Sequence, residues 1–225
     1  MSYPIQPLLD SFAAHADPEN AAAMSAYMRD LFPFYGIKKP ERAALFKAHV
    51  GQYGLPAAEA ALHEAIRALW DRPERECHYS ACDLLGKQLK KLSPASLGLI
   101  EQLIVSKSWW DTVDALTSYA GTLFQRHPAS RDQYLNRWRA ADDFWLRRAA
   151  ILHQRHYRTA TDAELLFAII RENLGAREFF INKAIGWALR EYSKENGAAV
   201  REFIANHDLA PLSAREGAKW LQKHS

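Results

Sequence analysis

The chain has 225 residues, enough for a substantial core in one or two domains, and its 48% hydrophobic and 24% charged residues are ordinary for a globular protein. The formal net charge of +3 at pH 7 is only a weak hint of an anionic partner, so nucleic-acid binding would require basic residues gathered on one surface. No stretch approaches about 18 consecutive apolar residues, and residues 1–12 lack the basic and apolar segments of a secretory signal. We therefore expect a cytoplasmic protein with no membrane partner.

Capping signals predict helices along the whole chain. Asp17 and Ser93, each followed by proline, are predicted N-caps. Three further segments fit a capping box or its aspartate variant: Ser108-x-x-Asp111, Thr161-x-x-Glu164 and Ser213-x-x-Glu216. Gly175 stands where a helix would end, and Asn196-Gly197 ends one helix and starts another. No strand-like alternation persists beyond a few residues, so the sequence predicts an all-α fold.

The residues that could bind a metal do not form a recognisable site. Cys77 and Cys82 lie five residues apart on one predicted helix, a spacing that suits neither a disulfide nor a zinc site, and we interpret both as reduced core residues. His153-x-x-His156 has a chelating spacing without an evident third ligand. Signatures for nucleotide binding (a P-loop or GxGxxG) are absent. We predict neither cofactor nor metal.

A loose repeat relates four of the predicted helices. Aligning segments 78–87, 110–119, 146–155 and 181–190 matches four small or β-branched residues at spacings of 32, 36 and 35: Ala81, Val113, Ala149 and Ala184. Small residues at equivalent places allow close packing, as in solenoids of HEAT-like or TPR-like pairs. The predicted fold is a single domain, 1–225, forming a curved solenoid (an alpha-alpha superhelix) of paired antiparallel helices. An irregular helical bundle is the alternative.

The segment 107–114, KSWWDTVD, carries the sharpest chemical feature. On a helix starting near Ser108, Trp110 and Asp114 lie at i and i+4 on one face, whereas Trp109 is turned by about 100°. One indole can therefore point inward while the other sits beside a carboxylate. Asp114 alone is more simply read as a salt-bridged or solvated side chain, and a single tryptophan as a core residue.

Two further clusters fall on the aligned helices. Lys183, Trp187 and Arg190 share a face at i, i+4 and i+7, and Arg148 follows Arg147 in segment 146–155. If the aligned helices are neighbours, one concave surface collects the candidate residues Trp110, Asp114, Arg148 and Trp187. Alternatively, the arginines at 148 and 190 form ion pairs with nearby carboxylates: Asp142, Asp143 or Glu191.

Segments 107–114, 146–154 and 178–192 closely resemble the AlkD-like DNA alkylation repair family, and the likeness extends over nearly the whole chain. The resemblance implies a HEAT-like solenoid that excises alkylpurines and works as a monomer without an obligate protein partner. It also implies roles for seven residues: Trp110 and Trp187 cradle the lesion, Asp114 is the catalytic carboxylate, Arg148 and Tyr27 face the DNA, and Lys183 and Arg190 contact phosphates.

The chemistry agrees with this resemblance. Cleavage of an N-glycosidic bond passes through an oxocarbenium-like sugar. An N3-alkyladenine or N7-alkylguanine already carries a positive charge and leaves without protonation, so one carboxylate such as Asp114 can suffice. Indole faces attract cations by about 0.5–2 kcal/mol each. We expect a monofunctional alkylpurine DNA glycosylase that acts on duplex DNA in base excision repair.

Two other functions fit parts of the pattern. A non-catalytic relative that recognises bent or branched DNA would keep a basic groove and lose the tryptophan and aspartate set. A protein-binding HEAT-like scaffold would require that the paired indoles beside a carboxylate arise by coincidence. Release of free base from methylated DNA distinguishes the enzyme from the binder.

Overall fold

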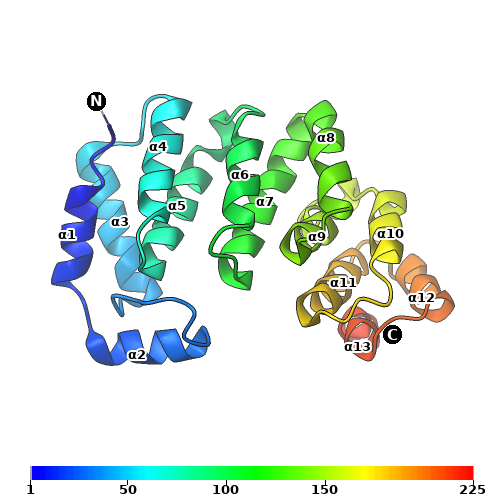
Figure 1. The fold of residues 1–225 in the computed structure, drawn as a ribbon. Helices are drawn as coiled ribbons and strands as arrows, with labels where there is room; N and C mark the ends of the chain where they lie inside the picture. The colour runs from blue at the N-terminus through cyan, green and yellow to red at the C-terminus, as the bar shows by residue number, and fades with distance from the viewer. Residues whose placement is uncertain (1, 225) are drawn as a thin grey trace. The chain divides into compact units, whose positions relative to one another are not determined.

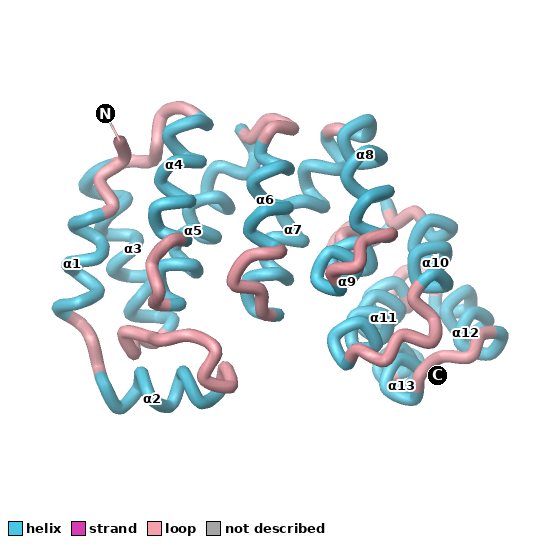
Figure 2. The backbone as a smooth tube through the Cα atoms, in the orientation of Figure 1, coloured by secondary structure: helices cyan, strands magenta, loops and turns pink. Residues whose placement is uncertain are grey.

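The computed structural model describes residues 2–224, and helices are the only regular secondary structure in that range. About 71% of the chain is helix, in 13 α-helices and three short 3-10 helices, with no strand in the described residues (Figures 1 and 2). The predicted all-α fold of paired helices is therefore confirmed. The chain divides into two compact units, one ending at Ser96 and the other beginning at Leu97.

The first unit contains five α-helices and one 3-10 helix: α1 (Gln6–Ala14), α2 (Pro18–Tyr27), α3 (Lys39–Tyr53), α4 (Glu59–Trp70), α5 (Arg75–Gln88) and η1 (Leu89–Lys91). Helix α1 packs on α3, and α4 packs on α5. The buried Glu76 carboxylate of α5 accepts three backbone N–H bonds from residues 35–37, which fixes the loop between α2 and α3. Cys77 and Cys82 both lie on α5 as buried free thiols, as predicted.

The second unit continues the pattern of helical pairs. Its elements are α6 (Ser96–Ile104), α7 (Trp110–Arg126), α8 (Pro128–Arg139), α9 (Phe144–Leu152), η2 (Arg158–Ala160), α10 (Ala163–Glu172), α11 (Phe179–Tyr192), α12 (Gly197–Asn206), α13 (Pro211–Ala218) and η3 (Leu221–Lys223). Helices α7, α9, α11 and α13 pack successively in one row, and α8, α10 and α12 flank that row.

The residues that define the sequence repeat are all fully buried: Ala81, Val113, Ala149 and Ala184. They lie on α5, α7, α9 and α11, the second helix of each pair. Within the second unit, small side chains at these positions let α7, α9 and α11 approach one another. The internal repeat was thus a sound guide to which helices pack together.

Several predicted helix starts are displaced. Asp17 and Asn196 are N-caps as predicted, with their side chains accepting from Asn20 N and Ala199 N. The Ser108 and Ser213 predictions are wrong. The Ser108 hydroxyl donates back to the Ile104 carbonyl, and α7 begins only at Trp110. Ser213 lies inside α13 and donates to the Asn182 carbonyl, linking α13 to α11.

Two smaller shifts have similar local causes. Asp162, not Thr161, caps α10 and accepts from Leu165 N, while the Thr161 hydroxyl donates to the Arg158 carbonyl. After Ser93, α6 begins at Ser96, because the Ser93 hydroxyl accepts from Ala95 N in a turn before the helix. In each case a competing hydrogen bond nearby moved the boundary.

No helix among residues 2–224 combines the length and the apolar character needed to span a bilayer.

Close contact between α7 and the segment after α9 depends on Gly121. A Cβ added there would lie 2.2 Å from the backbone oxygen of His153, which cannot retreat as a flexible side chain would. The Tyr157 hydroxyl donates to the Gly121 carbonyl at 2.6 Å, so this contact is also hydrogen-bonded. Burial raises the pKa of Tyr157, consistent with its position in the packed interior.

We predict that Gly121→Ala destabilises the protein by about 1–3 kcal/mol, because the methyl group overpacks a backbone contact. Gly51→Ala is the matched control: it lies within α3 and a Cβ there meets nothing within 4 Å. That change should stabilise by about 0.5–1 kcal/mol through helix propensity. Urea unfolding of the two variants measures both effects, and a Gly121→Ala protein as stable as wild type would contradict the packing argument.

Candidate functional site

The start of α7 sends its two tryptophans in different directions. Trp109 is the extended N-cap residue, and its ring packs 6.0 Å from Trp145 and 5.1 Å from Phe180, measured between ring centroids. Trp110, the first helical residue, is half-buried, and Asp114 follows one turn later on the same face. The structure therefore places one indole in an aromatic cluster and the other beside a carboxylate.

Asp114 and Arg148 form a bidentate ion pair between α7 and α9. Arg148 Nε donates to Oδ1 and Nη2 donates to Oδ2, both at 2.9 Å. The third guanidinium nitrogen, Nη1, donates to the Phe180 carbonyl of α11 at 2.7 Å. The side chain of Arg148 is only 2% exposed, whereas that of Asp114 is 11% exposed. The pair fixes the orientation of the carboxylate and leaves a small part of the Asp114 side chain exposed.

This pairing changes the interpretation of Arg148. The sequence placed it on an open surface facing DNA, or in an ion pair with Asp142 or Asp143. Its actual partner, Asp114, lies 34 residues away, so the nearby pairing is wrong. With its guanidinium buried on Asp114 and Phe180, Arg148 is a positioning residue here, and contact with a phosphate stays a prediction.

Lys183 and Arg190 project from α11 toward a single buried carboxylate, Glu216 of α13. Lys183 Nζ lies 3.0 Å and Arg190 Nη1 3.2 Å from its oxygens, and Lys219 approaches to 2.6 Å. The hydrogen bond from Lys219, with further help from Lys183, lowers the pKa of Glu216 to about 2 against the opposing effect of burial. The ion pair of Arg190 with Glu191, considered from the sequence, is therefore wrong.

Trp187 lies on the same face of α11 and is flanked by two guanidinium groups. The Arg155 Cζ atom is 4.7 Å and the Arg190 Cζ atom 5.8 Å from its ring centroid. Both distances are within the range of a cation–π contact. The structure thus brings Asp114, Arg148 and Trp187 onto three successively packed helices, with Trp110 one turn before the carboxylate.

Arg155 is a site residue that sequence reasoning missed. Its Nη2 donates to Ser118 Oγ at 3.4 Å and to His156 Nε2 at 3.2 Å. Burial lowers the pKa of Arg155, Asp114 raises it and Arg148 lowers it, so these charges lie close together. The spacing could have indicated it. Arg155 follows Arg148 by seven residues, and residues seven apart lie on the same face where helical turns continue.

Tyr27, the remaining predicted DNA-side residue, belongs to the first unit. It ends α2 and is 72% exposed. Its ring lines a largely apolar cavity of about 260 Å³ with Met24, Phe34 and Tyr79 among its other walls. A contact of Tyr27 with DNA stays a prediction.

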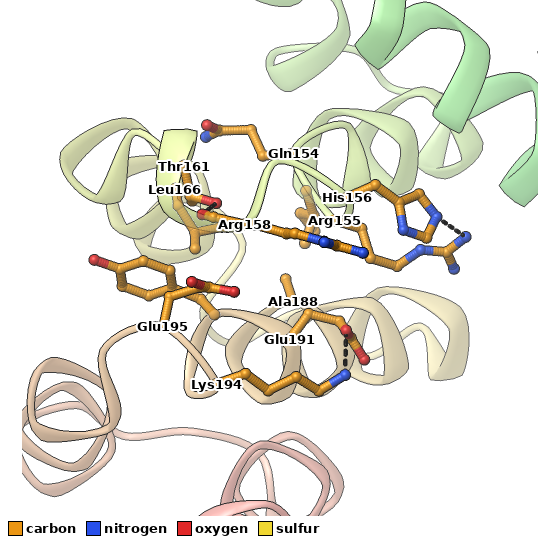
Figure 3. Close-up of a pocket in the computed structure, with 12 residues that line it drawn as sticks. Gln154, Arg155, His156, Arg158, Thr161, Leu166, Ala188, Glu191, Lys194 and Glu195 are labelled. Atoms are coloured by element: carbon orange, nitrogen blue, oxygen red, sulfur yellow. Dashed lines mark hydrogen bonds and ion pairs between the residues drawn. The ribbon is translucent and has the colours of Figure 1, made fainter.

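The histidines at 153 and 156 serve separate roles. His153 is buried, its Nδ1 donates to the Ala150 carbonyl at 2.7 Å, and burial lowers its pKa to about 4. His156 is exposed and accepts from Arg155 (Figure 3). Within residues 2–224, no three histidine, cysteine, aspartate or glutamate side chains gather as a group able to hold a metal.

Comparison with known proteins identifies the family. Residues 8–221 match the family model described as DNA alkylation repair enzyme. The chain belongs to this family. A solved structure titled as a predicted DNA alkylation repair enzyme from Enterococcus faecalis is similar, with 37% identity and a TM-score of 0.85. That likeness covers 92% of this chain and 97% of the other. Among curated proteins, no match was found.

Membership of this family indicates the kind of partner that the site has. The family is one of enzymes that repair alkylated DNA, so DNA is the expected partner of this member. The match spans both compact units, since it begins in the first and ends in the second. The residues gathered around Asp114 all lie in the second unit.

We predict that Arg148→Met destabilises the protein by about 3–5 kcal/mol, because the Asp114 carboxylate loses its partner while still nearly buried. Adding Asp114→Asn to this variant should cost much less than the sum of the single changes, since the unpaired charge is gone. Denaturant unfolding of both single variants and the double variant measures this coupling.

Arg137→Met is the control: Arg137 also pairs with a carboxylate through two bonds, yet it is 49% exposed. Its loss should cost less than about 1 kcal/mol. Additive effects at 114 and 148 would contradict the prediction.

Proposed function

We propose that this protein is a monofunctional DNA glycosylase that hydrolyses the N-glycosidic bond of cationic N3- and N7-alkylpurines in duplex DNA. The observation that carries the proposal is the Asp114 carboxylate, held by two bonds from Arg148, partly exposed, and one helical turn after Trp110. The family match over residues 8–221 supports a single functional domain, and we propose that it acts as a monomer.

In the proposed reaction Asp114 stabilises positive charge on deoxyribose. As the glycosidic bond breaks, the bonding electrons leave with the base and the sugar becomes oxocarbenium-like. The carboxylate faces this charge and positions a water molecule, which attacks the anomeric carbon and loses a proton to solvent. Arg148 holds the carboxylate still, so little reorganisation is needed when the charge develops.

The cationic base makes this single carboxylate sufficient. An N3- or N7-alkylpurine departs as a neutral base, so no acid has to protonate it. Trp110 and Trp187 are proposed to attract its charge through their ring faces, each contributing about 0.5–2 kcal/mol. The guanidinium of Arg155, 4.7 Å from the centre of the Trp187 ring, supports this role because it shows that the ring accepts a cation.

Binding to the DNA backbone is proposed to use the cations around Glu216. Lys183, Arg190 and Lys219 outnumber the one carboxylate that they share, so this surface of α11 and α13 keeps a positive charge. Each neutralised phosphate releases counterions, so affinity for duplex DNA should fall steeply as salt rises. Tyr27 is proposed as a further DNA contact from the first unit.

One observation favours a second candidate, a non-catalytic DNA-binding protein. Asp114 is already paired with Arg148, and Trp187 is already covered by Arg155, so both groups have partners without DNA. A protein that binds duplex tightly and releases no base would fit this alternative.

We predict that Asp114→Asn loses excision while retaining DNA binding. The lost charge acts mainly on the transition state, so the single-turnover rate on N7-methylguanine DNA should fall by roughly 10²–10³. Affinity for undamaged duplex should stay within about threefold.

Asp111→Asn is the matched control, because Asp111 lies in the first turn of the same helix, three residues earlier. It should react at close to the wild-type rate. Thermal melting verifies that both variants are folded. An Asp114→Asn enzyme as fast as wild type would reduce Asp114 to a structural residue.

We also predict that excision requires a positive charge on the base and no metal. Matched duplexes should carry N7-methylguanine, its uncharged 7-deaza analogue or uracil, with chelator present throughout. Only the cationic base should be released, leaving an intact abasic site without strand cleavage. Efficient excision of uracil would show that a general acid is present, and loss of activity with chelator would show a metal requirement.

A further inference from the structure

Arg155, in the turn after α9, has no carboxylate within ion-pair distance, unlike the neighbouring Arg147, Arg148 and Arg190. Its hydrogen bonds go to two neutral groups, Ser118 Oγ and His156 Nε2, and no ion pair involves it among residues 2–224. Each of three neighbouring arginines forms an ion pair with a carboxylate: Arg147 with Glu178, Arg148 with Asp114 and Arg190 with Glu216. Asp114 and Glu191 lie near enough to raise the pKa of Arg155, but neither contacts it directly. A half-buried guanidinium with no carboxylate in direct contact favours an anionic ligand.

A cavity of about 340 Å³ opens beside this guanidinium, between the segment after α9 and the helices α10 and α11. Its walls carry three cationic side chains, Arg155, Arg158 and Lys194, and two carboxylates, Glu191 and Glu195 (Figure 3). Lys194 is paired with Glu191 at 2.6 Å, so Arg155 and Arg158 are the cations left to meet a ligand. The opening is large enough for a phosphate group together with part of the chain that carries it.

The cavity adjoins the candidate site through Arg155 itself. The same side chain covers the Trp187 ring at 4.7 Å and contacts Ser118, whose hydroxyl donates to the backbone carbonyl of Asp114. An anion bound at Arg155 would therefore lie next to the carboxylate and the indole. In a nucleic acid, the anion at such a distance from the reacting sugar is a backbone phosphate of that nucleotide or its neighbour.

We propose that Arg155 binds a DNA backbone phosphate beside the lesion nucleotide, at the mouth of this cavity. This inference rests on the proposed function and adds a contact that the family resemblance did not assign. It also resolves a charge conflict. An unneutralised Arg155 next to Asp114 would oppose the positive charge that develops on the sugar, and a phosphate removes that opposition.

The test measures duplex affinity against salt for wild type, Arg155→Leu and Arg155→Lys. Losing one phosphate contact should make the slope of log K against log salt shallower by about 0.9. The loss of duplex affinity of Arg155→Leu relative to wild type should therefore be about threefold larger at 50 mM salt than at 200 mM salt. Arg155→Lys keeps the charge and should restore the wild-type slope. Arg171→Leu is the control, since it removes an exposed arginine of α10 that does not line this cavity.

The salt slope separates this role from a purely structural one. A residue that only supports the fold would lower affinity equally at every salt concentration, whereas a lost phosphate contact makes the salt slope shallower. A loss of affinity in Arg155→Leu with an unchanged salt slope would overturn the proposal. Equal slopes for Arg155→Leu and Arg171→Leu would also overturn it.

Two further outcomes are distinguishable. Calorimetry with inorganic phosphate alone tests whether the cavity binds free phosphate instead. If wild type binds inorganic phosphate, Arg155→Leu does not, and the DNA salt slope is the same for both, the cavity binds free phosphate and the proposed DNA contact is wrong. If wild-type protein binds duplex but releases no base, the proposed glycosylase activity is wrong, and the comparison of salt slopes still tests the contact between Arg155 and phosphate. Wild-type protein that does not bind duplex refutes both.

Discussion

The guanidinium of Arg148 connects three successive helices through one side chain. Two of its nitrogens hold the Asp114 carboxylate of α7, a third holds the Phe180 carbonyl of α11, and its own backbone belongs to α9. Burying such a pair is expensive unless the geometry is good and the remaining donors are satisfied. Here the bidentate geometry and the third bond meet that requirement. Lysine could not replace it, because an ammonium group offers no planar fork. The position of the carboxylate therefore depends on how these three helices pack.

The cations around this pair differ in how far carboxylates neutralise them. Arg148 is buried and fully neutralised, Arg190 and Lys183 are half-buried and share Glu216, and Arg155 has no carboxylate in direct contact. Buried Glu216 is strongly favoured as an anion, since its pKa is lowered to about 2. It therefore holds its cations together at neutral pH without cancelling their total charge. Cations fixed in this way lose little conformational freedom when a polyanion binds, which is the advantage of preorganisation.

Local patterns predicted the helices and part of the site, while long-range partners could not be read from the sequence. The repeat identified Ala149 and Ala184 as buried contacts because close packing demands small residues at fixed intervals. The i, i+4 spacing likewise placed Trp110 and Asp114 on one face. The partner of Arg148 lies 34 residues away and that of Arg190 lies 26 away, on other helices, so neither follows from helical periodicity. Ser108 and Ser213 were misread because each found a hydrogen-bond acceptor other than the expected helix terminus.

The proposed chemistry has a consequence for substrate choice that follows from the same ion pair. Both oxygens of Asp114 accept hydrogen bonds from Arg148, so each is already engaged as an acceptor. A group held this way is poorly suited to deliver a proton to a leaving base. It is well suited to face a developing cation from a fixed position. Under the proposed function, the Arg148 clamp that orients Asp114 also restricts the enzyme to bases that bring their own positive charge.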